Sequence, residues 1–210
     1  MKKTGRGDFS ADRRLIQLST ISIGIGIAAS LVAVVLLKLI AWFTNLFFYH
    51  QLSLTPRGPA GSPLGLWMII VPVIGGLIIG LMARYGTEKI RGHGIPEALE
   101  AILFGKSLMS LKVAILKPLS SAISIGSGGP FGAEGPIIMT GGAFGSMAAQ
   151  FFHMTSTERK TLLVAGAAGG MSATFAAPVA AAMLAAELLL FEFKPRSLIP
   201  VALASATAAV

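Results

Sequence analysis

The sequence predicts an all-α integral membrane protein whose helices are tilted and partly broken. Of the 210 residues, 54% are hydrophobic and 12% are charged, and this charged share is about half that of an average soluble domain. One soluble core could not bury so much apolar surface, so lipid is the expected solvent. Two further observations support this prediction: basic residues gather at the ends of apolar segments, and several later apolar segments are short and interrupted by glycine or proline.

The net charge of +8 indicates membrane topology rather than nucleic-acid binding, because of where the charges lie. Basic residues precede the first apolar run at Lys2, Lys3, Arg6, Arg13 and Arg14. Others follow the second run at Arg84, Lys89 and Arg91, whereas loop 51–63 has only Arg57. The positive-inside rule then makes 1–14 a cytoplasmic segment and places loop 51–63 outside, as in a prokaryotic inner-membrane protein.

Two long apolar segments, 15–48 and 64–83, are predicted to cross the membrane. The first is too long for a cleaved signal peptide and long enough to span at a tilt. An aromatic cluster at its far end is typical of a membrane interface; it comprises Trp42, Phe43, Phe47, Phe48 and Tyr49. The second contains Gly75, Gly76 and Gly80, a pattern that favours close helix contact in lipid.

The later apolar segments are shorter, and several fall below the roughly 20 residues that a spanning helix needs. They are 95–104, 108–125, 136–152, 161–170 and 174–191. Broken helices at membrane depth must direct their ends into protein or a cavity, and many transporters build a central site in this way. A last segment, 198–210, is apolar to its final residue, so we expect 15–210 to be an incomplete transmembrane domain.

Chemistry that depends on thiols or bound metals is not expected. The chain has no cysteine, and His50, His93 and His153 have no metal-ligand spacing. We therefore predict no cofactor, no metal and no enzymatic activity. A remote alternative is an intramembrane enzyme with Glu134 as general base, which requires a catalytic partner nearby. A purely structural membrane subunit would explain the glycines but not a buried Glu134 or Lys117.

The segment 92–97, Gly-His-Gly-Ile-Pro-Glu, predicts a helix start. Its glycines permit an unusual backbone path, and Pro96 and Glu97 suit the first helical turn. The unpaired N–H groups and positive dipole end of such a start attract anions. The alternative is an ordinary Gly/Pro helix start.

A second helix start is predicted in 126–136, which has five glycines and two prolines in eleven residues. No Gly-Lys-Ser/Thr follows, so a phosphate-binding loop is disfavoured. Glu134 lies at the N-terminal end of the predicted helix. Ionisable residues at membrane depth are costly and usually functional. The alternative is a carboxylate that only caps the helix.

Lys117 lies deep in the apolar segment 108–125. At that depth it needs a carboxylate partner or an anionic ligand. A structural ion pair with Glu97 or Glu100 is the alternative, and the sequence leaves both possibilities open.

These motifs resemble those of the CLC chloride channels and transporters. The sequence at 92–96 resembles the first selectivity-filter motif, usually GSGIP, and 132–136 resembles the second, usually GREGP. Lys117 falls where the family has a lysine in the intervening helix. Further on, 166–170 and 175–178 resemble the next two helices of the family.

The resemblance implies a homodimer in which each subunit has its own chloride pathway, built from two inverted-topology halves of which this chain is the first. The implied anion-path residues are Gly92, His93, Gly94, Ile95, Pro96, Gly132, Ala133, Glu134, Gly135 and Pro136. Glu134 matches the gating glutamate that also transfers protons on the outer side, and Glu192 matches the internal proton-transfer glutamate of the exchangers. Lys117 would give electrostatic support.

Glu192 favours proton-coupled exchange over the alternative, a passive gated channel of the same family. His93 stands where the usual motif has serine, and Ala133 replaces the usual arginine. The third filter segment and the anion-coordinating tyrosine of the second half are absent from the 210 residues. We therefore expect that this chain alone does not transport anions.

Overall fold

The computed structural model describes residues 13–209, and every regular element in that range is helical. The all-α prediction is confirmed, whereas most of the expected cytoplasmic segment 1–14 lies outside the described residues. In chain order the helices are α1 (Arg13–Tyr49), η2 (Gly65–Ile69), α2 (Ile70–Tyr85), η3 (Glu88–Ile90), α3 (Ile95–Leu103), α4 (Leu111–Gly126), α5 (Glu134–Phe151), α6 (Ser156–Phe175), α7 (Pro178–Ala185), η4 (Ala186–Leu190) and α8 (Pro195–Ala208).

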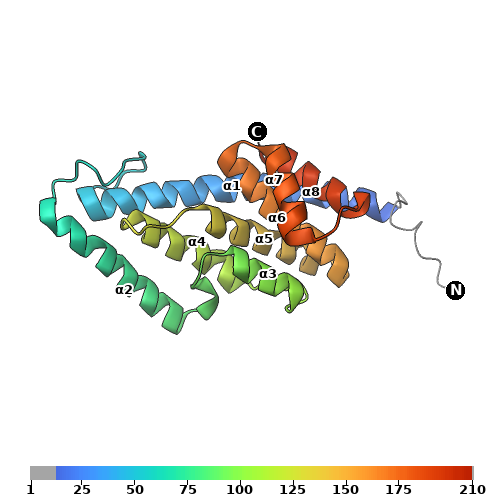
Figure 1. Cartoon of the computed structure of the whole chain (residues 1–210), viewed down its shortest axis with the longest axis horizontal. Helices are drawn as coiled ribbons and strands as arrows, with labels where there is room; N and C mark the ends of the chain where they lie inside the picture. The colour runs from blue at the N-terminus through green and yellow to red at the C-terminus, as the bar shows by residue number, and fades with distance from the viewer. Residues whose placement is uncertain (1–12, 210) are drawn as a thin grey trace.

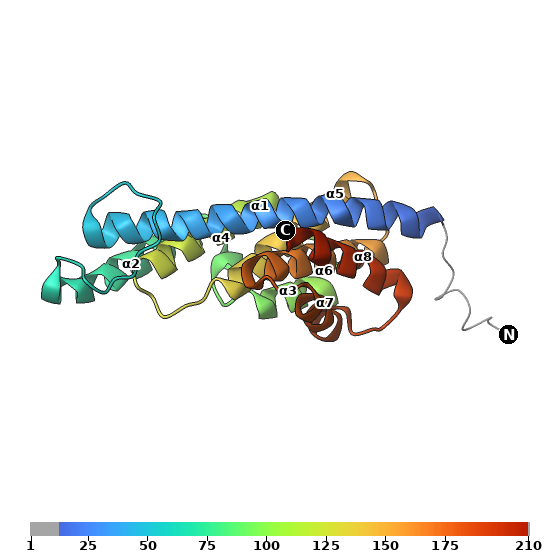
Figure 2. The ribbon, with the colours of Figure 1, turned by 90° about the horizontal axis from the view of Figure 1, so that it is seen from above.

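Helix α1 runs along most of the molecule, and α2 diverges from it at one end (Figures 1 and 2). Within the described residues, α1 and the η2–α2 unit are the helices long and apolar enough to cross a membrane, each with a mean hydropathy of 2.5. Only 28% and 17% of their most apolar windows are buried. Most of their apolar surface is therefore left for lipid or for other protein.

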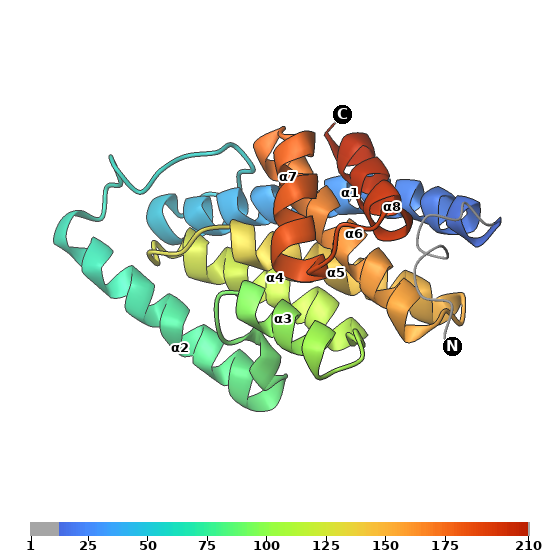
Figure 3. The ribbon, with the colours of Figure 1, turned by 45° about the vertical axis from the view of Figure 1, so that its right-hand side comes forward.

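The centre of the molecule is the crossing of α5 and α6, which are buried along most of their lengths. A Cβ atom added to Gly141 would collide with the carbonyl of Gly166, and one on Gly145 would collide with that of Leu162. The two backbones therefore touch, as small residues permit in membrane helices. Helices α7 and α8 pack on α6, and α3 lies on the side of the bundle away from α1 (Figures 1–3).

Two of the predicted segments, 161–170 and 174–191, differ most from the observed helices. The predicted segment 161–170 is part of a longer α6, because Thr155 and Glu158 form a capping box that starts the helix earlier. The predicted segment 174–191 is not one helix. Ala176 takes a left-handed conformation, with φ 51°, before Pro178 begins α7. The α7 helix then continues as the π-helix η4, which ends at the left-handed Phe191.

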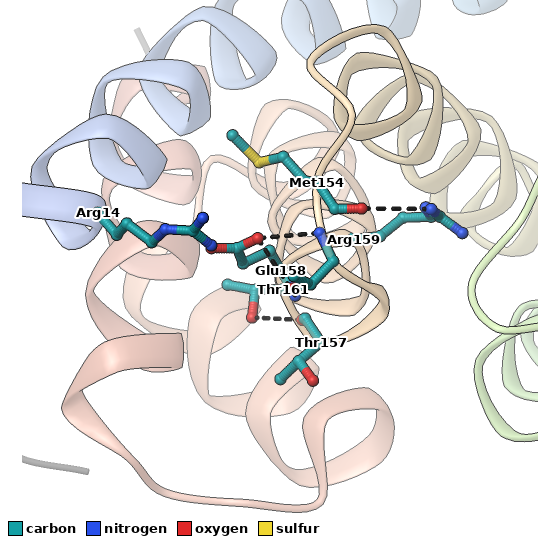
Figure 4. A network of polar contacts seen from close by, with 7 residues as sticks. Arg14, Met154, Thr157, Glu158, Arg159 and Thr161 are labelled. Carbon is teal, nitrogen blue, oxygen red and sulfur yellow. Dashed lines mark hydrogen bonds and ion pairs between the residues drawn. The ribbon is translucent and has the colours of Figure 1, made fainter. Parts of the chain in front are cut away.

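The beginnings of α1 and α6 are joined by an ion pair (Figure 4). Arg14 Nη1 lies 2.8 Å from Glu158 Oε1. The other carboxylate oxygen, Oε2, accepts hydrogen bonds from the backbone N–H and the hydroxyl of Thr155, at 2.9 and 2.8 Å. Glu158 is buried although Arg14 is exposed. The donors from Arg14 and Thr155 therefore replace the water that would otherwise stabilise the charged carboxylate.

Candidate functional site

The first motif forms a tight turn that leads into α3. Gly92 and Gly94 have φ values of 85° and 114°, a region that favours glycine. Pro96 is the second residue of α3, as expected of a proline in a first turn. Glu97 reaches back, and its Oε2 accepts a hydrogen bond from the backbone N–H of Gly94 at 2.7 Å. The turn is therefore closed by its own helix.

This carboxylate changes which amides of the turn remain free. The N–H of Gly94 is bound to Glu97, whereas those of His93 and Ile95 have no acceptor within the described chain. His93 is exposed and Ile95 is half-buried, so an amide here without a protein partner is available to a ligand or to water. The first motif thus offers two N–H groups, at His93 and Ile95.

The second motif ends in the first turn of α5. Ala133 is the N-cap residue, Glu134 is the first helical residue, and the N–H of Ile137 donates to the carbonyl of Ala133 at 3.0 Å. The amides of Glu134 and Gly135 precede this first helical bond and have no acceptor in the described chain. The predicted start at 136 is two residues late, since Pro136 lies within the first turn.

The two helix starts lie against each other. A Cβ atom on Gly94 would collide with the carbonyl of Gly135. A Cβ atom on Gly135 would collide with the carbonyl of His93 and would lie 2.7 Å from His93 Nδ1. The positive ends of α3 and α5 therefore meet at one place.

A cavity of about 460 Å³ borders this junction. Both motifs line it, the first with Gly92 and His93 and the second with Gly132 and Pro136. Helix α4 contributes hydroxyl-bearing residues to the wall, namely Ser120, Ser121, Ser124 and the C-cap Ser127. A second cavity, of about 650 Å³, touches the first motif but not 132–136 and has side chains of both charge signs. The smaller cavity is the one that both helix starts share.

Glu134 differs from expectation because it is exposed rather than buried in the described chain. Its Oε2 lies 3.2 Å from the position that a Cβ atom on Gly132 would take. Side chains on a helix lean toward its N-terminus, so the carboxylate folds back over its own turn and away from the α5–α6 core. It lies beside Gly132 of the second motif and has no hydrogen bond or ion pair within the described chain.

Lys117 is buried, with 1% of its surface exposed, but its neighbours differ from those expected. Its Nζ donates to the carbonyl of Ile90 at 3.1 Å and to that of Gly92 at 2.8 Å. Neither Glu97 nor Glu100 forms an ion pair with it. Backbone carbonyls of the first motif therefore take the place of the predicted carboxylate.

Glu192 lies in the loop between η4 and α8. It accepts a hydrogen bond from Ser197 Oγ at 2.8 Å, and Lys194 Nζ lies 3.5 Å from its other oxygen. It lines neither cavity at the first motif. The structure therefore does not bring Glu192 to the junction of the two helix starts.

Glu187 is an acid within the otherwise apolar η4 and belongs to none of the motifs recognised in the sequence. Its side chain is exposed and has no hydrogen bond or ion pair within the described chain. Like Glu134, it is an ionisable residue in an apolar segment, and such residues are costly in a membrane and usually functional.

Together these features define a helical membrane protein in which two helix starts converge beside a cavity that is partly lined by serine residues. A family model described as voltage gated chloride channel matches residues 75–210. The chain belongs to this family, whose members are integral membrane proteins.

Individual relatives agree with this assignment. The chain is 32% identical over 144 residues to a putative chloride channel protein ClcB-like of Ralstonia nicotianae, covering 67% of this chain and 34% of the relative. It is 37% identical over 142 residues to the H(+)/Cl(-) exchange transporter ClcA of Vibrio campbellii, covering 66% and 30%. It therefore spans about a third of the length of these relatives.

A solved structure has the same fold. The crystal structure of a slow cyanobacterial Cl-/H+ antiporter superposes with a TM-score of 0.67 at 21% sequence identity. The match covers 95% of this chain and 46% of that one. The predicted arrangement of tilted, broken helices is thereby confirmed.

Proposed function

We propose that this chain forms the first half of a chloride pathway whose anion site lies where α3 and α5 begin. The observation that carries the proposal is the contact between Gly94 and Gly135. It brings together free N–H groups of His93, Ile95, Glu134 and Gly135. Amides at helix starts attract anions through partial positive charges.

Partial charges suit transport better than a full countercharge would. The buried Lys117 is hydrogen-bonded to carbonyls and lines neither cavity, and the cation at the wall of the smaller cavity is the exposed Arg91. An ion held by amide dipoles can enter and still leave, which conduction requires. Chloride is the small anion named for the relatives described above, and no cofactor or metal takes part in the proposed pathway.

Glu134 is the proposed gate. Its carboxylate is itself a small anion tethered beside the free amides, so it competes with chloride for one site. Protonation removes its charge and its affinity for the amide dipoles, which frees the site. The exposed position of Glu134 leaves the side chain room to move.

Coupled exchange of chloride and protons is the preferred mode, with Glu134 as outer and Glu192 as inner proton-transfer group. Its support is the named activity of the Vibrio relative and of the solved neighbour. A passive gated channel is the second candidate. The hydrogen bond and ion pair that engage Glu192 favour the channel, as does similarity to a voltage-gated ClC-type chloride channel ClcB of Yersinia pestis.

The remaining parts of the proposal concern the assembly. A second, inverted half completes the pathway, two such subunits form a homodimer, and the protein lies in a prokaryotic inner membrane with its N-terminus in the cytoplasm. The basic residues around the two long helices support this orientation.

The test is ion flux in liposomes that contain the complete transporter. We expect chloride efflux, recorded with a chloride electrode, accompanied by uphill proton movement, recorded as external pH. Chloride efflux without proton movement would select the channel, and no chloride efflux would refute the proposal. Liposomes containing the 210-residue chain alone are expected to show no flux, because half of the pathway wall is missing.

A further inference from the structure

Lys117 is the most deeply buried charged side chain near the junction, and its direct role remains to be assigned. We infer that Lys117 is a positioning residue, which turns the Gly92–His93 peptide so that the His93 N–H faces the anion pathway. This inference rests on the proposed function and replaces the expected role of general electrostatic support. Two observations support it: Lys117 donates hydrogen bonds to backbone carbonyls, and it lines neither of the two cavities at the first motif.

The first step is the location of Lys117. It belongs to α4, is 1% exposed and lines neither the cavity of about 460 Å³ nor that of about 650 Å³. An anion at the junction therefore meets the turn at 92–94 and not the lysine. Any effect of Lys117 on that anion must pass through the backbone of the turn or act as a field at a distance.

The second step is the geometry of the peptide bond. The carbonyl of Gly92 accepts a hydrogen bond from Lys117 Nζ at 2.8 Å. In a planar trans peptide the C=O of one residue and the N–H of the next point in opposite directions, and the Gly92–His93 peptide is trans. Since the carbonyl of Gly92 points at Lys117 Nζ, the N–H of His93 must point away from that Nζ.

The third step is that the turn is restrained at both ends. Lys117 also binds the carbonyl of Ile90, at 3.1 Å, and Glu97 binds the N–H of Gly94 at 2.7 Å. The His93 amide lies between these contacts and has no acceptor in the described chain. Gly92 has φ 85°, a conformation in which glycine moves readily between alternatives. Without Lys117, the Gly92–His93 peptide would be the part of the turn most free to rotate.

Two substitutions separate hydrogen bonding from charge. In the complete transporter, Lys117→Gln removes the charge but keeps an N–H₂ donor, whereas Lys117→Met has a similar chain without a donor. We expect K117Q to bind chloride within about threefold of wild type and K117M to lose about tenfold, the equivalent of one net hydrogen bond. Chloride affinity is measured by isothermal titration calorimetry on detergent-solubilised protein.

Different outcomes refute different claims. Equal losses in K117Q and K117M would mean that an N–H₂ donor at this position does not hold the turn, and wild-type affinity in K117M would mean that the contact is irrelevant; either result overturns the inference alone. If the wild type neither binds nor transports chloride, the proposed function fails and the inference with it.

A second measurement does not depend on the folding of K117M. In wild-type protein labelled with ¹⁵N-histidine, the backbone amide resonance of His93 is expected to shift on addition of chloride. A His93→Gln variant, which removes one resonance, assigns the signal. A His93 amide that does not respond to saturating chloride would overturn the inference.

Discussion

Gly94 and Gly135 touch backbone to backbone, although 40 residues separate them in the chain. Gly94 is the N-cap residue of α3, and Gly135 is the second residue of α5. Neither position has room for a β-carbon. The site therefore depends on two glycines whose missing side chains allow two positive helix ends to meet.

Gly135→Ala tests this contact. The new methyl group would collide with the carbonyl of His93, and backbone atoms cannot move aside cheaply, so we expect a destabilisation of about 1–3 kcal/mol and loss of chloride binding. Gly80→Ala is the matched control, since a methyl group there meets nothing within 4 Å. Thermal unfolding in detergent and chloride titration measure the two effects. A normal G135A protein would show that the helix starts do not meet as described.

Glu134→Gln tests the proposed gate. The amide has nearly the shape of the carboxylate but carries no charge and does not bind protons. We therefore expect chloride flux to persist and to become independent of pH, while proton movement stops. Simultaneous chloride-electrode and pH recordings on liposomes make the measurement. Proton-coupled transport at the original ratio in E134Q would remove Glu134 from its proposed role.

The inner proton-transfer group is tested by comparing Glu192→Gln with Glu187→Gln. Glu192 was singled out by family resemblance but is bound to Ser197 and Lys194, whereas Glu187 is unpartnered in the described chain. We expect E192Q to reduce proton flux at least about tenfold more than chloride flux, equivalent to about 1.4 kcal/mol in the proton-transfer barrier. The opposite result, a selective loss in E187Q, would transfer the role to Glu187.

The ion pair between Arg14 and Glu158 predicts a pH-dependent stability. Burial alone would raise the pKa of Glu158, but hydrogen bonds from Thr155 and Arg14 and the charge of Arg14 outweigh it, so the net pKa lies below its ordinary value of 4.5. A depressed folded-state pKa adds stability that is complete above the unfolded pKa and is lost as the pH falls through the folded pKa.

We therefore expect wild-type protein to lose this increment below about pH 4.5, the ordinary value. Glu158→Gln should be less stable by about 1–3 kcal/mol at pH 7 and should lack this component of acid sensitivity. Unfolding temperatures measured from pH 7 to pH 3 test both statements. Glu88→Gln, which changes an exposed acid, is the control. Parallel pH profiles for wild type and E158Q would contradict the assignment.

Much of the helical architecture was predictable because its signals are local. Apolar run length located α1 and α2, and glycine and proline marked the starts of α3 and α5 to within two residues. The split of 174–191 was not predicted, because a left-handed residue is usually a glycine and position 176 is an alanine. The partners of Lys117 were also not predicted. A sequence shows which residues carry opposite charges, but every residue has a backbone carbonyl, and only the packing of helices brings those of Ile90 and Gly92 to Lys117.

By itself, the sequence determined that the chain is apolar enough for lipid, that its fold is all-α, and that two glycine-rich motifs begin helices. Composition and short-range backbone preferences suffice for this because they do not depend on distant contacts. Only the tertiary structure decided that the starts of α3 and α5 touch, that Glu134 is exposed, and that Lys117 binds the turn rather than a carboxylate. These relationships join residues far apart in the chain. Packing of whole helices sets them, since the α5–α6 crossing and the place of α4 fix which backbone groups come within hydrogen-bonding distance.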